Sequence, residues 1–197
     1  MDPARDAAIL AAALEGLTER GYDRLTMDDI AARAHAGKDT LYRRWASKAE
    51  LVVDAMAAHR AAVAPAEVPD TGSLAGDFHA MISTVPRFSE SGLRIFAGLV
   101  TAASRDPELA TAVDAQLLSM PRRALRQVLE RAADRGEIPD GRNLDLAPDV
   151  VIGLNLLHII TGHPVDRTFM HRVLYEVLLP LVTAPTGIIP TPGESGI

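Results

Sequence analysis

The chain has 197 residues, of which 48% are hydrophobic and 23% are charged, as in an ordinary globular protein. It contains no cysteine, which excludes disulfides and thiolate metal sites. The first ten residues lack the pattern of an export signal, and no apolar run reaches the roughly 18 residues that a membrane span needs. We therefore expect a cytoplasmic protein with no membrane span.

The net charge is −6, so the overall charge gives no reason to expect an anionic partner. The positive charges are unevenly placed, however. Both lysines of the chain, Lys38 and Lys48, lie in residues 38–48, and this stretch has a net charge of +3. A compact cationic element in an acidic protein indicates that an anionic partner binds at this element.

Helical spacing recurs along the chain, and no stretch shows the sustained alternation of a strand. Leu10, Leu14 and Leu17 share one face of the first predicted helix, and Gly21 stands where a left-handed residue would close it. The further predicted helices cover residues 28–34, 38–45, 47–63, 74–85, 92–104, 106–121, 121–136, 145–161 and 166–182. The sequence thus predicts an all-α fold with ten helices.

Capping residues set several of these boundaries. Thr26 with Asp29, and Ser47 with Glu50, have the spacing of a capping box, in which each residue satisfies a backbone N–H of the other. The sequence Asp106-Pro107 has a capping acid followed by a proline, which is typical of a helix start.

Prolines mark two further boundaries. We expect Asp145 and Pro148 to begin the helix of residues 145–161, and Pro121 to kink or break the helix in which it lies.

The second and third predicted helices have the pattern of a helix-turn-helix, in which the second helix of the pair enters the DNA major groove. Leu41 and Trp45 lie on one face, and we expect them to pack on Ile30 and Ala31 as the core of this domain. The side chains expected to contact DNA are Thr26, Lys38, Asp39, Thr40, Tyr42, Arg43, Arg44 and Lys48. Arg43 either contacts DNA or only faces solvent.

The motif resembles the DNA-binding domain of the tetracycline-repressor (TetR) family over about residues 5–55. The resemblance is carried by residues 26–34, Lys38, residues 40–45 and residues 47–51. It implies an all-helical homodimer with nine or ten helices, whose C-terminal domain binds a small effector and dimerises. We accordingly expect a DNA-binding domain at residues 1–50, a ligand-binding and dimerisation domain at 51–183, and a flexible tail at 184–197.

Three positions depart from the family pattern, which commonly reads Gly-Val-Ser before the lysine. His35 puts a side chain where a left-handed residue is favoured, and Gly37 replaces a capping serine. Asp39 is an acid on the base-reading face. It either accepts a hydrogen bond from cytosine N4 or merely suits the helix dipole, so the sequence does not specify an operator.

The chain has six histidines, but none has the spacing of a metal-ligand pair, so we expect no metal and no cofactor. His59 and His158 are either core groups or pocket groups. The residues that the resemblance makes candidates for an effector pocket are Met56, His59, Phe78, Met81, Ile82, Phe96, Val100, Met120 and His158. Side chains at this spacing form a core more often than a pocket.

In the TetR family the eighth and ninth helices of two subunits pack as a four-helix bundle. With a break at Pro121, these helices fall on residues 121–135 and 146–161, and the second of them is apolar on nearly every side. The residues expected at the dimer interface are Leu125, Val128, Leu129, Val151, Leu154, Leu157 and His158.

Together these features predict a transcriptional regulator that binds double-stranded operator DNA. We expect a repressor released from a near-palindromic operator by a small effector; the alternatives are an activator or a ligand-independent DNA-binding protein of the same fold. An enzyme on a helical bundle is disfavoured, because the chain has no nucleotide-binding or hydrolase motif. The sequence identifies neither the effector nor the regulated genes.

Overall fold

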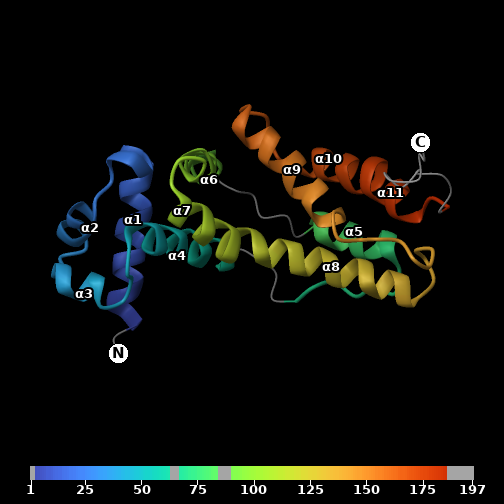
Figure 1. The fold of residues 1–197 in the computed structure, drawn as a ribbon, viewed down its shortest axis with the longest axis horizontal. Helices are drawn as coiled ribbons and strands as arrows, with labels where there is room; N and C mark the ends of the chain where they lie inside the picture. Colours follow the sequence, from blue (N-terminus) through green and yellow to red (C-terminus); the bar gives the residue numbers. More distant parts are fainter. Residues whose placement is uncertain (1–2, 63–66, 84–89, 186–197) are drawn as a thin grey trace, which may run out of the picture.

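The computed structural model describes residues 3–62, 67–83 and 90–185, and these residues form helices and connecting segments without a strand. The all-α prediction is therefore confirmed. One end of the elongated molecule consists of α1 (Pro3–Arg24), α2 (Met27–Arg33) and α3 (Lys38–Tyr42) (Figure 1). We call this end the head. Val85, Pro86 and the expected tail from residue 186 lie outside the described residues.

The remaining helices form the middle of the molecule and its other end, where α9 and the helices after it lie over α5 and α8 (Figure 1). Their bounds are α4 (Lys48–Ala61), α5 (Leu74–Ser83), α6 (Glu90–Ala103), α7 (Pro107–Ala112), α8 (Ser119–Asp134), α9 (Ala147–Ile160), α10 (Arg167–His171) and α11 (Leu179–Thr183). Two π-helical segments, η1 (Val113–Leu118) and η2 (Arg172–Leu178), connect α7 to α8 and α10 to α11. Among the described residues, none of the helices has the length and apolar character needed to cross a bilayer.

Of the two outcomes expected for Pro121, a kink or a break, the break does not occur. Residues 107–134 stay helical throughout, and the wide π turns of η1 end just before Pro121. Proline has no N–H to donate and its ring crowds the carbonyl four residues earlier, so a wider turn at this point accommodates it. The same arrangement recurs at Pro180, which follows η2. If α7, η1 and α8 are counted as one continuous helix, and α10, η2 and α11 as another, the described residues form nine helices. This is one fewer than expected.

The buried apolar side chains form two clusters, which we call the first and second core. The first core joins the head and α4 to α6, α7 and η1. The second core joins α5, α8 and α9 to η2 and α11. The helical rod of residues 107–134 contributes to both, with Leu109 in the first core and Leu129 in the second. A displacement of this rod would therefore be felt in both halves of the molecule.

Most of the predicted helix boundaries are confirmed. Gly21 interrupts α1 with a positive φ of 70°, a conformation that costs glycine little. Asp106 caps α7, because its side chain accepts from the backbone N–H groups of residues 108 and 109. Asp145 does not cap α9: the N-cap is Leu146, and the Asp145 carboxylate instead pairs with Arg126 at 3.0 Å.

A buried carboxylate holds the segment before α5 against α8. Asp77 is completely buried and accepts from the N–H of Thr71 at 2.6 Å and from its hydroxyl at 2.9 Å. Arg135 at the end of α8 lies 3.2 Å from the same carboxylate. A buried charge must be paired and hydrogen-bonded to be tolerated, and both conditions are met here.

Candidate nucleic-acid interface

The two short helices of the head, α2 and α3, are positioned by a capping box and by packing in the core. Thr26 and Asp29 form the predicted capping box at the start of α2, which lowers the pKa of Asp29 because its carboxylate accepts from Thr26. Leu41 and Trp45 are buried against Ile30 and the rest of the first core, as predicted. The face of α3 that carries Leu41 is therefore used for packing, and the opposite face is available to a partner.

Trp45 has a polar contact that the sequence did not indicate. Its indole Nε1 donates to a carboxylate oxygen of Asp54 on α4 at 2.8 Å. At the start of α4 the Ser47 hydroxyl accepts from the N–H of Glu50, and the Glu50 carboxylate accepts from the N–H of Ala46. The expected capping box is thus formed in part, with its second hydrogen bond shifted by one residue. Together these bonds fix α3 relative to α4.

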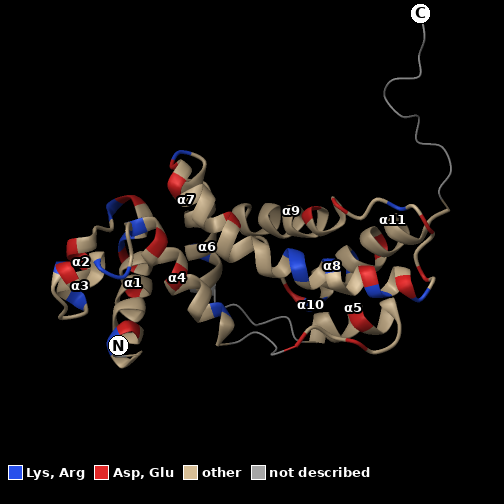
Figure 2. Cartoon of the chain, turned by 60° about the horizontal axis from the view of Figure 1, so that its bottom comes forward, with Lys and Arg blue, Asp and Glu red and all other residues tan. Residues whose placement is uncertain are grey.

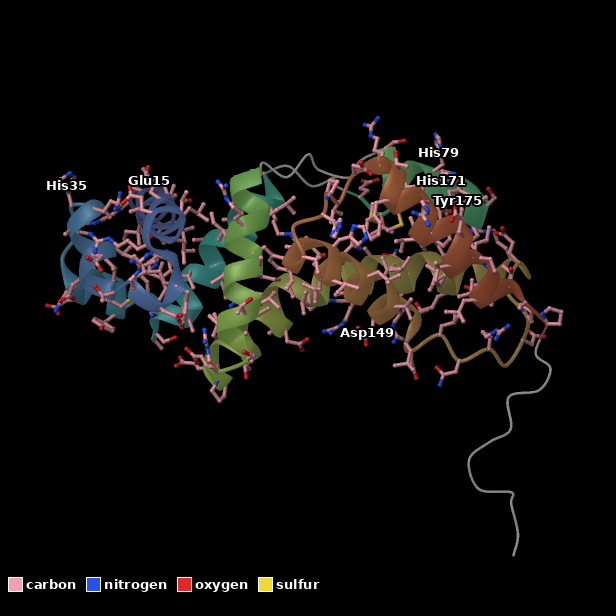
Figure 3. The ribbon with its side chains drawn as sticks, turned by 90° about the horizontal axis from the view of Figure 1, so that it is seen from above. Glu15, His35, His79, Asp149, His171 and Tyr175 are labelled. Carbon is pink, nitrogen blue, oxygen red and sulfur yellow. The ribbon has the colours of Figure 1, made fainter. Side chains whose placement is uncertain are left out.

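The turn between α2 and α3 contains the one described non-glycine residue with a positive φ. This is His35, at a φ of 49°, and its side chain points outward at the corner of the head (Figure 3). The N–H of Ala36 donates to the carbonyl of Ala31 at 2.9 Å, which closes the turn. Gly37 is the N-cap of α3 and provides no side-chain hydrogen bond. Both departures from the family pattern therefore lie where the sequence predicted a left-handed residue and a cap.

Basic and acidic side chains alternate over α2 and α3 (Figure 2). Lys38 is exposed, but its ammonium group lies 2.6 Å from the Asp28 carboxylate, and this hydrogen bond raises the pKa of Lys38. Arg43 is exposed, and its side chain has neither an ion pair nor a hydrogen bond with the described residues. A polyanion would thus meet Arg43 directly and would compete with Asp28 for Lys38.

Two of the predicted DNA contacts are turned toward the protein instead of outward. Arg44 is half-buried, pairs with the Asp6 carboxylate of α1 and lies over the ring of Trp45 at 5.8 Å from its centroid. Lys48 donates from Nζ to the carbonyl of Tyr22 at 2.9 Å and lies 3.9 Å from the centroid of its ring. Burial lowers the pKa of Lys48. In this structure both cations hold the head together.

The remaining candidates lie on the outer face of α3 or at its edge. Tyr42 is 53% exposed, Asp39 is exposed and its carboxylate has no hydrogen-bond partner among the described residues, and Thr40 is half-exposed. Thr26 is exposed as well, but its hydroxyl is occupied by Asp29. Thr40, Asp39, Tyr42 and Arg43 thus offer a hydroxyl, a carboxylate, a phenol and a guanidinium group that can meet base edges and phosphates.

The structure adds a contact between the head and α7 that sequence reasoning missed. The Tyr22 hydroxyl donates to the Asp106 carboxylate at 2.9 Å, across 84 residues of sequence. Tyr22 is buried, and both burial and the neighbouring carboxylate raise its pKa. Asp106 could be recognised in the sequence as a helix cap, but no local signal identified Tyr22 as its partner.

The residues expected to line an effector pocket are divided between the two cores and the surface. Met56 is in the first core and Phe96 packs on it, whereas Phe78 and Ile82 are in the second core. The others are distributed as follows: Met81 packs on the second core, Val100 and His158 are half-buried, and Met120 is 48% exposed. The expectation for His59 as a core or pocket group is wrong, because it is exposed where α4 extends beyond the first core.

The residues expected at a dimer interface need a similar correction. Leu125, Val128, Leu129 and Val151 are buried in the second core of their own chain, so they offer no surface to another subunit. On α9, by contrast, Leu157 is 56% exposed, Leu154 is half-buried and His158 stacks on the ring of Phe169 at 3.5 Å between centroids. The error follows from Pro121, because the extra helix moved the count of the eighth and ninth helices by one.

The fold and this surface define a class: a helical protein with a helix-turn-helix head that binds DNA. Comparisons with known proteins identify its family. Residues 9–55 match the family described as bacterial regulatory proteins, tetR family, and residues 68–177 match the tetracyclin repressor-like C-terminal domain. The chain therefore belongs to the TetR family. It is a DNA-binding transcriptional regulator, and the members that it matches are regulators and not enzymes.

Individual relatives agree with this assignment. The chain is 37% identical over 179 residues to a DNA-binding transcriptional repressor TetR of Mycobacteroides abscessus, covering 90% of this chain and 94% of the relative. It is 34% identical to an HTH-type transcriptional regulator of Mycobacterium bovis, covering 93% and 90% of the two chains. The solved structure of a TetR family transcription regulator has a TM-score of 0.68 at 28% identity, with 90% and 98% covered.

Proposed function

We propose that the protein is a cytoplasmic homodimeric repressor that binds a near-palindromic operator and leaves it when a small effector binds. The observation that carries the DNA-binding part is the outer face of α3, where Arg43, Tyr42, Asp39 and Thr40 are presented above a buried Leu41. A short helix with one packed face and one polar face is what a major-groove reader requires. Repression is supported by the name of the relative from M. abscessus.

The dimer would use α9 together with the rod of α10, η2 and α11. These are the eighth and ninth helices once the count is corrected. Both carry large apolar side chains on the surface: Leu157 and Ile160 are 56% and 54% exposed, and Val177 and Leu181 are 43% and 47% exposed. Apolar side chains exposed on adjacent elements are typical of an interface between subunits. We propose this surface in place of residues 121–135.

Effector release would work by a shift in population. An effector that binds one arrangement of the C-terminal helices more tightly favours that arrangement, and the head spacing that belongs to it would no longer fit the operator. The helical rod of residues 107–134 supports such coupling, because it contributes to both cores. We propose residues 1–50 as the DNA-binding part and residues 51–183 as the part that binds effector and dimerises.

The test is a fluorescence-anisotropy titration of the full chain on the intergenic DNA next to its own gene, with a shuffled duplex of equal length as competitor. We expect sequence-specific binding by two protomers, with a footprint that overlaps the promoter. Equal retention on both duplexes would contradict the proposal, and so would a footprint upstream of the promoter together with increased transcription.

The dimer surface is tested separately by analytical ultracentrifugation. Leu157→Asp places a charge in the proposed interface and should give monomers with reduced operator affinity. Met120→Asp is the matched control, since Met120 is similarly exposed on α8 outside that surface. A Leu157→Asp protein that remains dimeric would exclude this interface.

A further inference from the structure

A hollow of about 310 Å³ lies between the C-terminal part of α1 and α6, which are neighbours at the junction of the head with the rest of the molecule (Figure 1). It is lined by none of the residues expected for an effector pocket. Its floor is apolar: Leu17 and Leu99 are 4% and 1% exposed, and Ile95 is half-buried beside them. Its rim contains three exposed arginines, Arg20, Arg24 and Arg94.

The rim carries a surplus of positive charge. Among the described residues, the one acid that lines the hollow is Glu19, and its carboxylate is already held by Arg33 of α2 at 2.5 Å. Arg20 pairs with Asp29 at 2.9 Å, which fixes the position of its side chain. Arg24 donates from Nε to the carbonyl of Arg20 at 3.1 Å, and its terminal nitrogens have no ion pair with the described residues. Among the residues that the structure describes, an anion entering the hollow would meet the guanidinium group of Arg24 and no unpaired carboxylate.

We propose that this hollow binds a small organic anion, a carboxylate with a short apolar tail. A guanidinium group presents paired N–H donors that match the two oxygens of a carboxylate. The floor of Leu17, Ile95 and Leu99 would bury the tail, a gain that inorganic phosphate or a nucleic acid backbone could not obtain. The volume is at the lower end of the range of about 300–1,000 Å³ found for ligand pockets, which limits the ligand to a small one.

A ligand in this position would touch α1 of the head and α6 at the same time. It would therefore favour arrangements in which these two helices stay together, and so restrict how the head moves on the rest of the chain. None of the residues expected for an effector pocket lines this hollow, so it is proposed as a separate site. Binding here is measured without DNA, and its failure would leave the proposed repressor function untouched.

Two glycines make the hollow accessible to experiment. Gly21 and Gly98 both line it, and a Cβ atom at Gly98 would meet nothing within 4 Å, so a side chain there would project into open space. Gly98→Leu should fill the hollow without a clash. Gly98→Ala is the matched control, because it makes the same change toward a residue that favours helices but adds only one methyl group.

The experiment is a titration of the full chain, labelled with ¹⁵N-glycine, with hexanoate as the probe. We expect a saturable shift of the Gly21 amide signal and no shift of Gly162, which lies at the end of α9. Hexanol and hexylammonium should not produce the shift, and inorganic phosphate should bind more weakly than hexanoate. Gly98→Leu should abolish the shift and Gly98→Ala should keep it. Arg24→Gln should weaken hexanoate by about tenfold, as expected for a lost charge-assisted hydrogen bond.

Several results would overturn the proposal. These are a Gly21 signal that does not respond to hexanoate, an equal response to hexanol or to phosphate, a response at Gly162 instead, or unchanged affinity in Gly98→Leu. If Gly98→Leu does not fold, Arg24→Gln decides the question, because that exposed side chain can be changed without disturbing the core.

Discussion

The hydroxyl of Tyr22 donates a hydrogen bond to the carboxylate of Asp106 at 2.9 Å, and this bond ties the end of α1 to the start of α7. The other oxygen of Asp106 accepts from the first N–H groups of α7, so one carboxylate caps the rod and holds the head. Lys48 adds a third element, because it lies on the ring of Tyr22 at the start of α4. The helices α1, α4 and α7 therefore meet at the uncharged side chain of Tyr22.

The first prediction concerns the titration of Tyr22. Burial and the Asp106 carboxylate raise its pKa above the usual 10.0, since both disfavour the phenolate. A raised folded-state pKa means that the stabilisation is fully present below pH 10 and is lost as the pH rises through the folded-state value. We expect the phenolate absorbance to contain one step well above pH 10, from one of the three tyrosines, that is missing in Tyr22→Phe. A variant that keeps this step would contradict the assignment.

The second prediction separates the two roles of Asp106. Tyr22→Phe removes one hydrogen bond and should lower the free energy of unfolding by about 1 kcal/mol. Asp106→Ala also removes the cap of α7 and should cost roughly 2 kcal/mol, whereas Asp106→Asn should retain the cap. Urea unfolding followed by the fluorescence of Trp45, the single tryptophan, provides the measurement. A double-mutant cycle of Tyr22→Phe with Asp106→Ala that shows no coupling would mean that the bond is absent in solution.

The third prediction concerns the turn before α3. His35 has a φ of 49°, a left-handed conformation that costs residues other than glycine about 1–2 kcal/mol. His35→Gly should relieve this strain and raise the midpoint of thermal unfolding, with a gain of roughly 0.5–1 kcal/mol after the added freedom of the unfolded chain is subtracted. His35→Ala keeps the strain and should give no gain. If glycine and alanine have equal effects, the turn is not strained.

The fourth prediction separates two adjacent arginines. Arg43 is exposed and unpaired among the described residues, so Arg43→Ala should weaken DNA binding and reduce the slope of log affinity against log salt by about 1. Arg44 pairs with Asp6, so Arg44→Ala should mainly lower the thermal midpoint of the head. Salt titrations on one duplex and thermal melts of both variants make the comparison. The reverse pattern would show that Arg44 leaves Asp6 when DNA binds.

Much of the fold could be predicted because its signals are local. The capping box of Thr26 and Asp29, the cap at Asp106 and the left-handed Gly21 each involve residues within one helical turn. The boundary error at Pro121, in contrast, has a cause that is not local. Whether a proline breaks a helix or is absorbed by a π turn depends on what the helix packs against, and here the rod is held by a core at each end.

The candidate interface was predicted less completely, because its charged side chains bind to groups that are distant in sequence. Arg44 pairs with Asp6, 38 residues away, and Lys48 donates a hydrogen bond to Tyr22, 26 residues away. The apolar stripe of α8 was correctly recognised as buried, but periodicity does not say whether its cover comes from the same chain or from a second subunit. In the structure α5 and α9 provide that cover.

By itself the sequence determined the helical class, the positions of most helices and the identity of the reading helix, because these depend on spacing and caps within a few residues. The tertiary structure alone decided which cations remain available to DNA, which apolar face remains exposed, and where α1 and α6 enclose a hollow. Those properties depend on which distant groups meet, and that is settled only when packing fixes the path of the whole chain.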